Sequence, residues 1–301
     1  MKNNTILSLF LAITILFSAN LFAQDLPIKH KGAVQPIDNL NSSALLSSLK
    51  KEVYKNKTWK NLIDKKMMSI GVVDLSNAND IQYAGLNDNN MMYAASLPKI
   101  AVLLAAMDAI DKGELKNSPT IQKDMRLMIS KSNNQATTRM IDRVGYEKIE
   151  EVLRSPDYML YDEKAGGGLW VGKRYAAGGR RYPEPMKGLS HAATTRQVCS
   201  FYYQLAMGNL VSDLRSKQML NIMENPDLHH KFVNTLDKIA PDARIFRKSG
   251  SWKNFHSDSV LVWDKDRKYI LVALIDDSQG EQIIRDLVIP LEKAIKNSRS
   301  L

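Results

Sequence analysis

The sequence is poor in cysteine and histidine and, beyond its first residues, in long apolar runs. Its one cysteine, Cys199, cannot form an intrachain disulfide and lies too deep in the chain for lipid attachment, so we predict a small core residue. No segment after Phe17 has the roughly 20 apolar residues that span a bilayer. The adjacent His229 and His230 have no acid or cysteine at ligand spacing, so we predict neither a metal nor an organic cofactor.

The positive net charge of +10 does not follow the pattern of a nucleic-acid-binding protein. The basic residues are dispersed among 32 acidic ones, with no basic stripe interleaved with aromatics. We therefore expect no nucleic-acid partner. In an exported protein, a positive field favours anionic envelope polymers or anionic small substrates. The sequence leaves the oligomeric state open.

Residues 1–23 have the features of a secretory signal peptide. Lys2 precedes an apolar stretch, Ile6–Phe17, and Ala23 stands at a plausible cleavage point, although the bulk of Leu21 leaves the exact site open. The apolar stretch is too short for a membrane-spanning helix. We therefore predict cleavage and export to the periplasm or the exterior, without stable membrane insertion afterwards.

Residues 24–40 contain two prolines and a glycine and are predicted to be a flexible leader, followed by a single catalytic domain over residues 41–301. Alternating and apolar runs predict strands at both ends of this domain, and helical spacing predicts helices between and beyond them. The predicted strands are 68–75, 81–86, 244–252, 259–263 and 269–276; the predicted helices are 41–56, one from Ser96 to Gly113, 123–130, 134–144, 194–207, 216–223 and a last one around 284–295.

This order of elements predicts an α+β fold with one antiparallel sheet of about five strands, to which both chain ends contribute. Terminal helices would cover one face, with residues 41–90 and 240–301 forming the α/β part and 91–239 a helical part alongside. The glycine-rich segment 156–190 is too long for an incidental connection, so we predict an ordered functional loop or a lid, anchored by Trp170.

Ser96 and Lys99 form an S-x-x-K pair at the head of a buried helix. A serine hydroxyl is a poor nucleophile until a base takes its proton, and residues three apart on a helix share one face. A helix N-terminus also offers free N–H groups where an oxyanion would form. The motif is weak alone, because Ser47 with Lys50 matches it on an ordinary amphipathic helix.

Two further motifs follow in order: S-N-N at residues 132–134, between two predicted helices, and K-S-G at 248–250, on a predicted strand. Together the three motifs resemble the penicillin-recognising serine hydrolases, which include class A β-lactamases and penicillin-binding proteins. The resemblance covers nearly the whole exported chain, since the order of strands and helices also agrees.

The resemblance implies a role for each motif residue. Ser96 would attack the carbonyl, and Lys99 would accept its proton, directly or through water, with a pKa lowered by burial and by the nearby cation Lys248. Ser132 would relay a proton to the leaving nitrogen, and Asn134 would hold Lys99 and a substrate amide. Lys248 and Ser249 would bind the substrate carboxylate, and the N–H groups of Ser96 and Ser251 would form the oxyanion hole. Gly250 would let the substrate approach the strand closely.

The sequence departs from the class A pattern at three places. Asn133 replaces the aspartate of the second motif, and the stretch from Ser96 to Ser132 is shorter than usual. The E-x-x-L-N pattern, whose glutamate activates the deacylating water, is absent. By position, Glu163 and then Glu184 are the nearest candidates for a deacylation base, although a solvated loop carboxylate is the ordinary interpretation of each.

The substrate implied is a β-lactam or a peptidoglycan peptide, cleaved through an acyl-serine intermediate. Because the glutamate that activates the deacylating water is absent, hydrolysis of the acyl-enzyme could be slow. The chain could then be a D-alanyl-D-alanine carboxypeptidase or related peptidoglycan hydrolase, or a penicillin-binding sensor that acylates without fast turnover. A module that only binds cell-wall peptides is a further alternative. His256 and Asp258 share one face of a strand and suggest either a structural pair or a serine triad, which would leave Lys99 unexplained.

Overall fold

A computed structural model describes residues 26–30 and 32–300 of the chain. The predicted signal peptide lies outside these residues. Within them, no helix is both long enough and apolar enough to cross a membrane.

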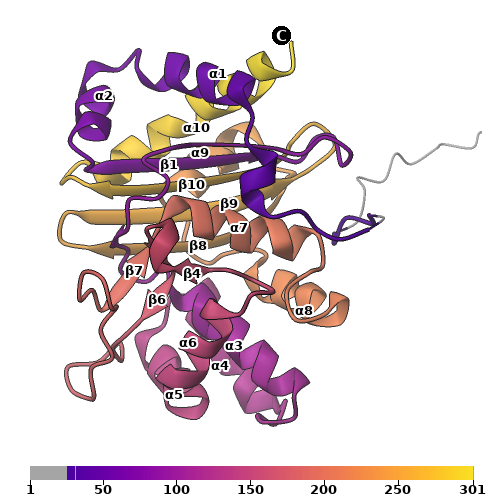
Figure 1. The fold of residues 1–301 in the computed structure, drawn as a ribbon, viewed down its shortest axis with the longest axis vertical. Coiled ribbons are helices and arrows are strands. Elements are labelled where there is room, and N and C mark those ends of the chain that lie inside the picture. Colours follow the sequence, from indigo (N-terminus) through magenta and orange to yellow (C-terminus); the bar gives the residue numbers. More distant parts are fainter. Residues whose placement is uncertain (1–25, 31, 301) are drawn as a thin grey trace, which may run out of the picture.

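The centre of the molecule is a five-stranded antiparallel sheet with the order β2-β1-β10-β9-β8 (Figure 1). The N-terminal strands lie beside the last strand of the chain, so both ends close one sheet, as predicted. β10 lies in the middle and is buried on both faces. The strands are β1 (Met68–Asp74), β2 (Gln82–Leu86), β8 (Arg244–Trp252), β9 (Phe255–Trp263) and β10 (Lys268–Asp276).

Alternate residues of the central strand enter two separate apolar cores. Leu271 and Ala273 face a core built with α1, α2, α9 and α10, whereas Ile270 and Val272 face a core shared with the helices of the other face. On that second face α7 packs against β1 and β10. The helices concerned are α1 (Ser43–Val53), α2 (Lys57–Asp64), α7 (Thr195–Ala206), α9 (Phe232–Ile239) and α10 (Gly280–Ser298).

Cys199 is fully buried in α7, as predicted, and it explains a glycine in the sheet. A Cβ on Gly71 of β1 would lie 2.6 Å from the Cys199 sulfur, so only glycine lets the helix pack this closely.

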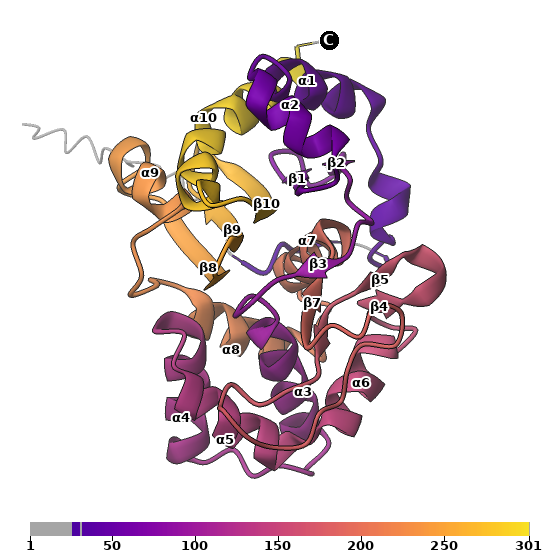
Figure 2. The same cartoon turned by 90° about the vertical axis from the view of Figure 1, so that its left-hand side faces the viewer.

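The helical part lies beyond the β8 edge of the sheet and surrounds α3, which is apolar on every side and almost fully buried (Figure 2). Two small sheets, β3-β7-β6 and β4-β5, lie in this part of the molecule, and β4, β5 and β6 belong to the long loop 156–190. Its helices are α3 (Lys99–Asp111), α4 (Pro119–Ser130), α5 (Asn134–Val144), α6 (Tyr146–Arg154) and α8 (Asp213–Met223); the small strands are β3 (Met92–Tyr93), β4 (Tyr161–Asp162), β5 (Gly167–Gly168), β6 (Trp170–Val171) and β7 (His191–Ala193), with short 3₁₀ turns η1 (Ile37–Leu40) and η2 (Glu163–Ala165).

The predicted α+β class and the antiparallel five-stranded sheet are confirmed. Three short helices, α2, α6 and α9, were not predicted. The division at residue 240 is displaced, because Phe232 and Leu236 of α9 enter the core under α10 and so belong to the α/β part.

The leader predicted to be flexible is largely packed against the fold from Leu26 onward. Ile28 and Ile37 are buried, and the Ile28 N–H donates to the Ala206 carbonyl at 2.7 Å. Burial of these two apolar side chains offsets the entropy of ordering a segment whose prolines and glycine suggested mobility.

Candidate active site

Ser96 lies in a turn between β3 and α3 rather than on the helix. The helix begins at Lys99, whose N–H donates to the Ser96 carbonyl at 3.3 Å, so the two residues remain one turn apart. The preceding residue, Ala95, has a φ of 50°, a left-handed conformation that costs free energy for a residue with a Cβ. The nucleophile predicted from the sequence therefore follows a strained backbone position.

Gly250 of β8 lies directly against the backbone of the Ser96 turn. A Cβ at this glycine would approach the Ser96 nitrogen to 2.5 Å and the Ala94 carbonyl oxygen to 2.4 Å. The K-S-G strand and the Ser96 turn therefore meet with no room for a side chain. The amides of Ser96 and Ser251, predicted to form the oxyanion hole, belong to these two adjoining segments.

If Ser96 is acylated as the resemblance implies, we expect Gly250→Ala to reduce acylation by nitrocefin by about 100-fold while the protein still folds. The new methyl group must displace backbone atoms next to Ser96, and misplacing a nucleophile by about 1 Å costs this much. Gly178→Ala is the control, since a Cβ there meets nothing within 4 Å. Stopped-flow rates equal to wild type for Gly250→Ala would contradict the packing argument.

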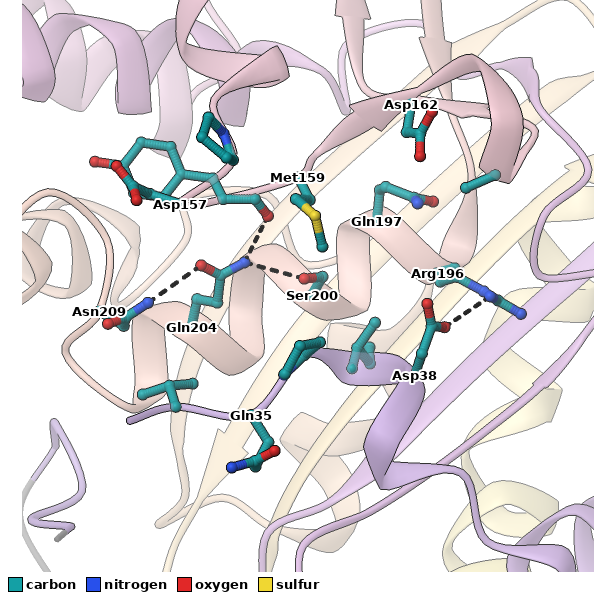
Figure 3. Close-up of a pocket in the computed structure, with 16 residues that line it drawn as sticks. Gln35, Asp38, Asp157, Met159, Asp162, Arg196, Gln197, Ser200, Gln204 and Asn209 are labelled. Atoms are coloured by element: carbon teal, nitrogen blue, oxygen red, sulfur yellow. Dashed lines mark hydrogen bonds and ion pairs between the residues drawn. The ribbon is translucent and has the colours of Figure 1, made fainter. Parts of the chain in front are cut away.

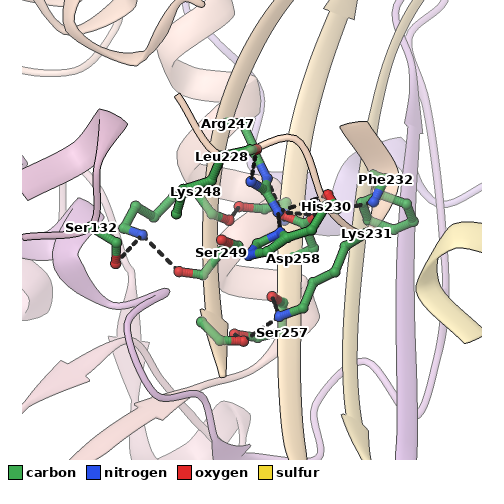
Figure 4. Close-up of polar contacts among 12 residues, drawn as sticks. Ser132, Leu228, His230, Lys231, Phe232, Arg247, Lys248, Ser249, Ser257 and Asp258 are labelled. Atoms are coloured by element: carbon green, nitrogen blue, oxygen red, sulfur yellow. Dashed lines mark hydrogen bonds and ion pairs between the residues drawn. The ribbon is translucent and has the colours of Figure 1, made fainter. Parts of the chain in front are cut away.

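Lys99 is fully buried and is held by the second motif. Its ammonium donates to the Ser132 carbonyl at 2.7 Å, to Ser132 Oγ at 3.2 Å and to Asn134 Oδ1 at 2.8 Å. Lys248, also buried, donates to the same Ser132 Oγ at 3.0 Å (Figure 4). Three distant segments of the chain therefore meet around one serine hydroxyl.

Burial lowers the pKa of Lys99 to about 7, because the charged amine has lost its water. Burial, and then repulsion from Lys99, lowers the pKa of Lys248 well below its usual value. Burial is the main cause of the lowered pKa of both lysines. The repulsion between them, expected to lower the pKa of Lys99, contributes instead to the lowered pKa of Lys248. A lysine with a pKa near neutrality can act as a base.

For the acylation that the resemblance implies, we expect the rate to rise with pH through about 7. The free amine is the basic form, so lowering the pH protonates Lys99, and the rate constant should fall about tenfold per pH unit below about pH 6. Nitrocefin acylation followed from about pH 5 to pH 9 measures this limb. A rate independent of pH over this range would exclude Lys99 as the base.

Ser132 begins the turn between α4 and α5 and also has a left-handed φ, of 53°. Asn133, which replaces the aspartate of the class A pattern, caps α5: its side-chain oxygen accepts the Ala136 N–H at 2.8 Å. Asparagine is as good an N-cap as aspartate. The departure at position 133 therefore preserves the turn that presents Ser132 and Asn134.

The third motif is supported by a buried polar network that the sequence analysis missed (Figure 4). Arg247 and Asp258 form a fully buried ion pair at 2.8 Å, and Asp258 also accepts the Phe232 N–H at the start of α9. Lys231, again with left-handed φ, donates to the Gly250 and Ser257 carbonyls and to Ser251 Oγ at 2.8 Å. No motif marks these residues, since they meet only when β8 pairs with β9 and the start of α9 packs against both strands.

The predicted partnership of His256 with Asp258 is wrong. Asp258 is engaged by Arg247, and His256 Nδ1 is buried with no hydrogen-bond partner among the described residues. The two side chains share a face of β9, as predicted. The Asp258 carboxylate is bound instead by Arg247, which lies on β8 two residues before Ser249, the residue paired with Asp258. This arrangement removes the basis for a serine triad built on His256.

The two candidate deacylation carboxylates are both engaged elsewhere. Glu163 is exposed and forms an ion pair with Arg154 at 2.8 Å. Glu184 is buried, accepts the Tyr161 hydroxyl and also accepts the N–H groups of Met186 and Lys187 at 2.8 and 2.6 Å. In the described part of the chain, no contact links either carboxylate to Ser96 or Lys99. Their assignment as a deacylation base stays an untested prediction.

An open cleft of about 790 Å³ adjoins the motif residues. Five of its lining residues have aromatic rings, and of the motif residues Asn134 lines it. Its lining includes Tyr93, Asn134, Tyr175, His191, Trp252 and Phe255. Trp170, predicted to anchor the long loop, does so: it is buried, and its indole N–H donates to the Tyr182 carbonyl at 2.8 Å.

A second cavity, of about 200 Å³, lies between the leader, the start of the long loop and α7 (Figure 3). Its polar side chains largely satisfy one another: Gln204 donates to Ser200 Oγ and to the Tyr158 carbonyl, and Arg196 pairs with Asp38 at 2.7 Å. None of the three motifs lines it, so it does not compete with the cleft as an active site.

Solved structures with the same fold include several β-lactamases and PBP-A. The chain is similar to a β-lactamase from Sphaerobacter thermophilus (16% identity, 86% of this chain and 98% of that one, TM-score 0.62) and to PBP-A (16%, 87% and 98%, 0.63). A β-lactamase from Chitinophaga pinensis is also similar (16%, 82% and 100%, 0.59). At these identities the likeness establishes the fold.

Among curated proteins, none matches this sequence. The model of the β-lactamase enzyme family, however, matches residues 55–125 and 116–290, which is well over half of the chain. The chain belongs to the β-lactamase enzyme family.

Proposed function

We propose that this protein is an exported serine hydrolase that cleaves an amide bond, in a β-lactam or a peptidoglycan peptide, through an acyl-serine intermediate on Ser96. The observation that carries the proposal is the meeting of Lys99 and Lys248 on the hydroxyl of Ser132, with the K-S-G strand packed against the Ser96 turn. An activated hydroxyl, a proton relay and a cation for an anionic substrate are the parts this chemistry needs.

In the proposed reaction, neutral Lys99 takes the Ser96 proton, directly or through water, as the oxygen attacks the carbonyl carbon. The amides of Ser96 and Ser251 stabilise the oxyanion. As the C–N bond breaks, Ser132 passes its proton to the leaving nitrogen and takes one from protonated Lys99, which becomes neutral again; water later hydrolyses the acyl ester. Ser132 suits this relay because its Oγ lies within hydrogen-bond distance of both lysines.

A substrate carboxylate fits the charge of this region. Lys99, Lys231, Arg247 and Lys248 are all buried on or near the K-S-G strand, where Asp258 is the one carboxylate that contacts them among the described residues. Burial and the nearby Lys99 lower the pKa of Lys248, and a bound anion would favour its protonated form, so Lys248 with Ser249 would bind the carboxylate. A related structure, a PBP-A variant, is an acyl-enzyme complex with penicillin G.

Slow turnover is the second candidate behaviour, and the placement of the loop carboxylates favours it. Glu163 pairs with Arg154 at the surface, and Glu184 accepts three hydrogen bonds within the loop, which supports a slow deacylation step. An enzyme of this kind would act as a D-alanyl-D-alanine carboxypeptidase or related peptidoglycan hydrolase, or as a penicillin-binding sensor.

The deciding experiment combines intact mass measurement with two turnover assays on the purified mature protein. Acylation by benzylpenicillin supports the acyl-serine mechanism, and sustained nitrocefin turnover without release of D-alanine from a peptidoglycan peptide identifies a β-lactamase. D-alanine release identifies the carboxypeptidase. An adduct that persists for hours without either turnover identifies a sensor, and no adduct at all contradicts the proposal.

Export is a separate part of the proposal and rests on residues 1–23. N-terminal sequencing of the protein recovered from the periplasm or the medium tests it. A mature protein that begins near residue 24 is the expected result, and an intact N-terminus retained in the cytoplasm would contradict it.

A further inference from the structure

One residue of the long loop contacts both the Ser96 turn and the proposed base. Tyr175 donates its hydroxyl to the Ala95 carbonyl at 3.0 Å, and its ring face lies 4.4 Å from the Lys99 ammonium. Ala95 is the strained residue immediately before Ser96. The resemblance to the family assigned no role to this tyrosine.

The two residues before Tyr175, and the Tyr175 ring itself, are anchored to the fold. The carbonyl of Lys173 accepts a hydrogen bond from the His191 ring at 3.0 Å, and the guanidinium of Arg174 pairs with Asp142 of α5 at 2.6 Å. The Tyr175 ring also packs on the His191 ring, with centroids 4.2 Å apart. The loop beyond it, residues 176–181, is exposed. Tyr175 is therefore the last anchored residue before an exposed loop tip.

We propose that Tyr175 is a positioning residue that holds the Ser96 turn and the Lys99 amine together and keeps water away from that amine. The inference rests on the proposed function for its meaning in catalysis, but its physical content concerns Lys99 alone. The hydroxyl fixes the backbone that precedes the nucleophile, and the ring covers the side of Lys99 that Ser132 and Asn134 leave open.

The charged and titratable groups that surround Lys99 agree with this role. Lys248 approaches from β8, neutral Ser132 lies in the turn before α5 and neutral Asn134 begins α5. His191 lies behind Tyr175 on β7. Burial lowers the pKa of His191 to about 4 and raises the pKa of Tyr175 well above its usual value, so both stay neutral near pH 7. No described carboxylate contacts Lys99, so exclusion of water controls its protonation.

Two substitutions separate the functions of the hydroxyl and the ring. Tyr175→Phe keeps the ring over Lys99 and loses the bond to Ala95, so we expect acylation about threefold to tenfold slower with an unchanged pH midpoint. Tyr175→Ala opens the site to water. Burial has moved the Lys99 pKa from 10.5 to about 7, and we expect water entering the site to raise it by about two units. Loss of the cation–π contact lowers it by about one unit, so the expected net rise of the midpoint is about one unit.

The midpoint is measured without relying on activity, by NMR titration of protein labelled with ¹³C at lysine Cε, with Lys99→Arg to assign the resonance. The pH profile of nitrocefin acylation is followed in parallel. Tyr182→Ala is the matched control, because Tyr182 belongs to the same loop and stacks on Trp170 without contacting Lys99. It should leave the Lys99 midpoint unchanged.

The two readouts keep this inference apart from the proposed function. A raised Lys99 midpoint in Tyr175→Ala, with no adduct in any variant, would support the positioning role and overturn the acyl-serine mechanism. Wild-type midpoints in folded Tyr175→Ala would overturn the positioning role, even if Ser96 is acylated normally. Equal midpoint shifts in Tyr175→Ala and Tyr182→Ala would also overturn it, since the loop as a whole would then be responsible.

Discussion

Ser96→Ala is expected to abolish the covalent adduct with benzylpenicillin and to slow nitrocefin turnover by at least about 10⁴-fold. The proposed mechanism forms a bond between the Ser96 oxygen and the acyl carbon, and alanine has no atom to form it. Binding should persist, because the groups proposed to hold the substrate carboxylate, Lys248 and Ser249, are unchanged. Intact mass spectrometry and a noncovalent binding assay measure the two effects.

A second S-x-x-K pair in the same chain provides the control for this experiment. Ser47 and Lys50 reproduce the S-x-x-K spacing on α1, where Ser47 is exposed to solvent. Ser47→Ala should acylate at the wild-type rate. An adduct that survives in Ser96→Ala, or that peptide mapping places on another residue, would exclude Ser96 as the nucleophile.

Asp258→Ala is expected to lower the free energy of unfolding by about 3–5 kcal/mol. The substitution leaves the Arg247 guanidinium buried without its counterion, and an unpaired buried charge carries a cost of this size. It also removes the acceptor for the Phe232 N–H at the start of α9. Urea unfolding followed by circular dichroism measures the loss.

Two further variants test whether the buried charge is the cause. Arg247→Met combined with Asp258→Leu should lose less than Asp258→Ala alone, because the double change removes both charges. Asp64→Ala breaks an exposed ion pair with Lys60 and should leave the urea midpoint nearly unchanged. Equal losses for Asp258→Ala and the double variant would assign the effect to packing instead.

The strands and the long helices could be predicted from local patterns, because each has a strong period of its own. The pattern of residues 68–75 predicted β1 to within one residue, and the apolar run after Ser96 predicted α3, which begins at Lys99 rather than at Ser96. Short helices such as α2 were not predicted, because eight residues are too few to show a clear helical period of apolar side chains. The leader was misjudged because its order depends on burying Ile28 and Ile37 against distant helices.

The sequence alone determined the three motifs, their order and the chemical type of every group in them, because residue identity and spacing along the chain are local properties. The tertiary structure decided which groups meet. It placed both lysines on one serine hydroxyl, turned Glu163 and Glu184 to other partners and brought Tyr175 over the Lys99 amine. Burial, which sets the pKa of Lys99, depends on side chains that lie tens of residues away in the chain and become neighbours only when the sheet and helices pack.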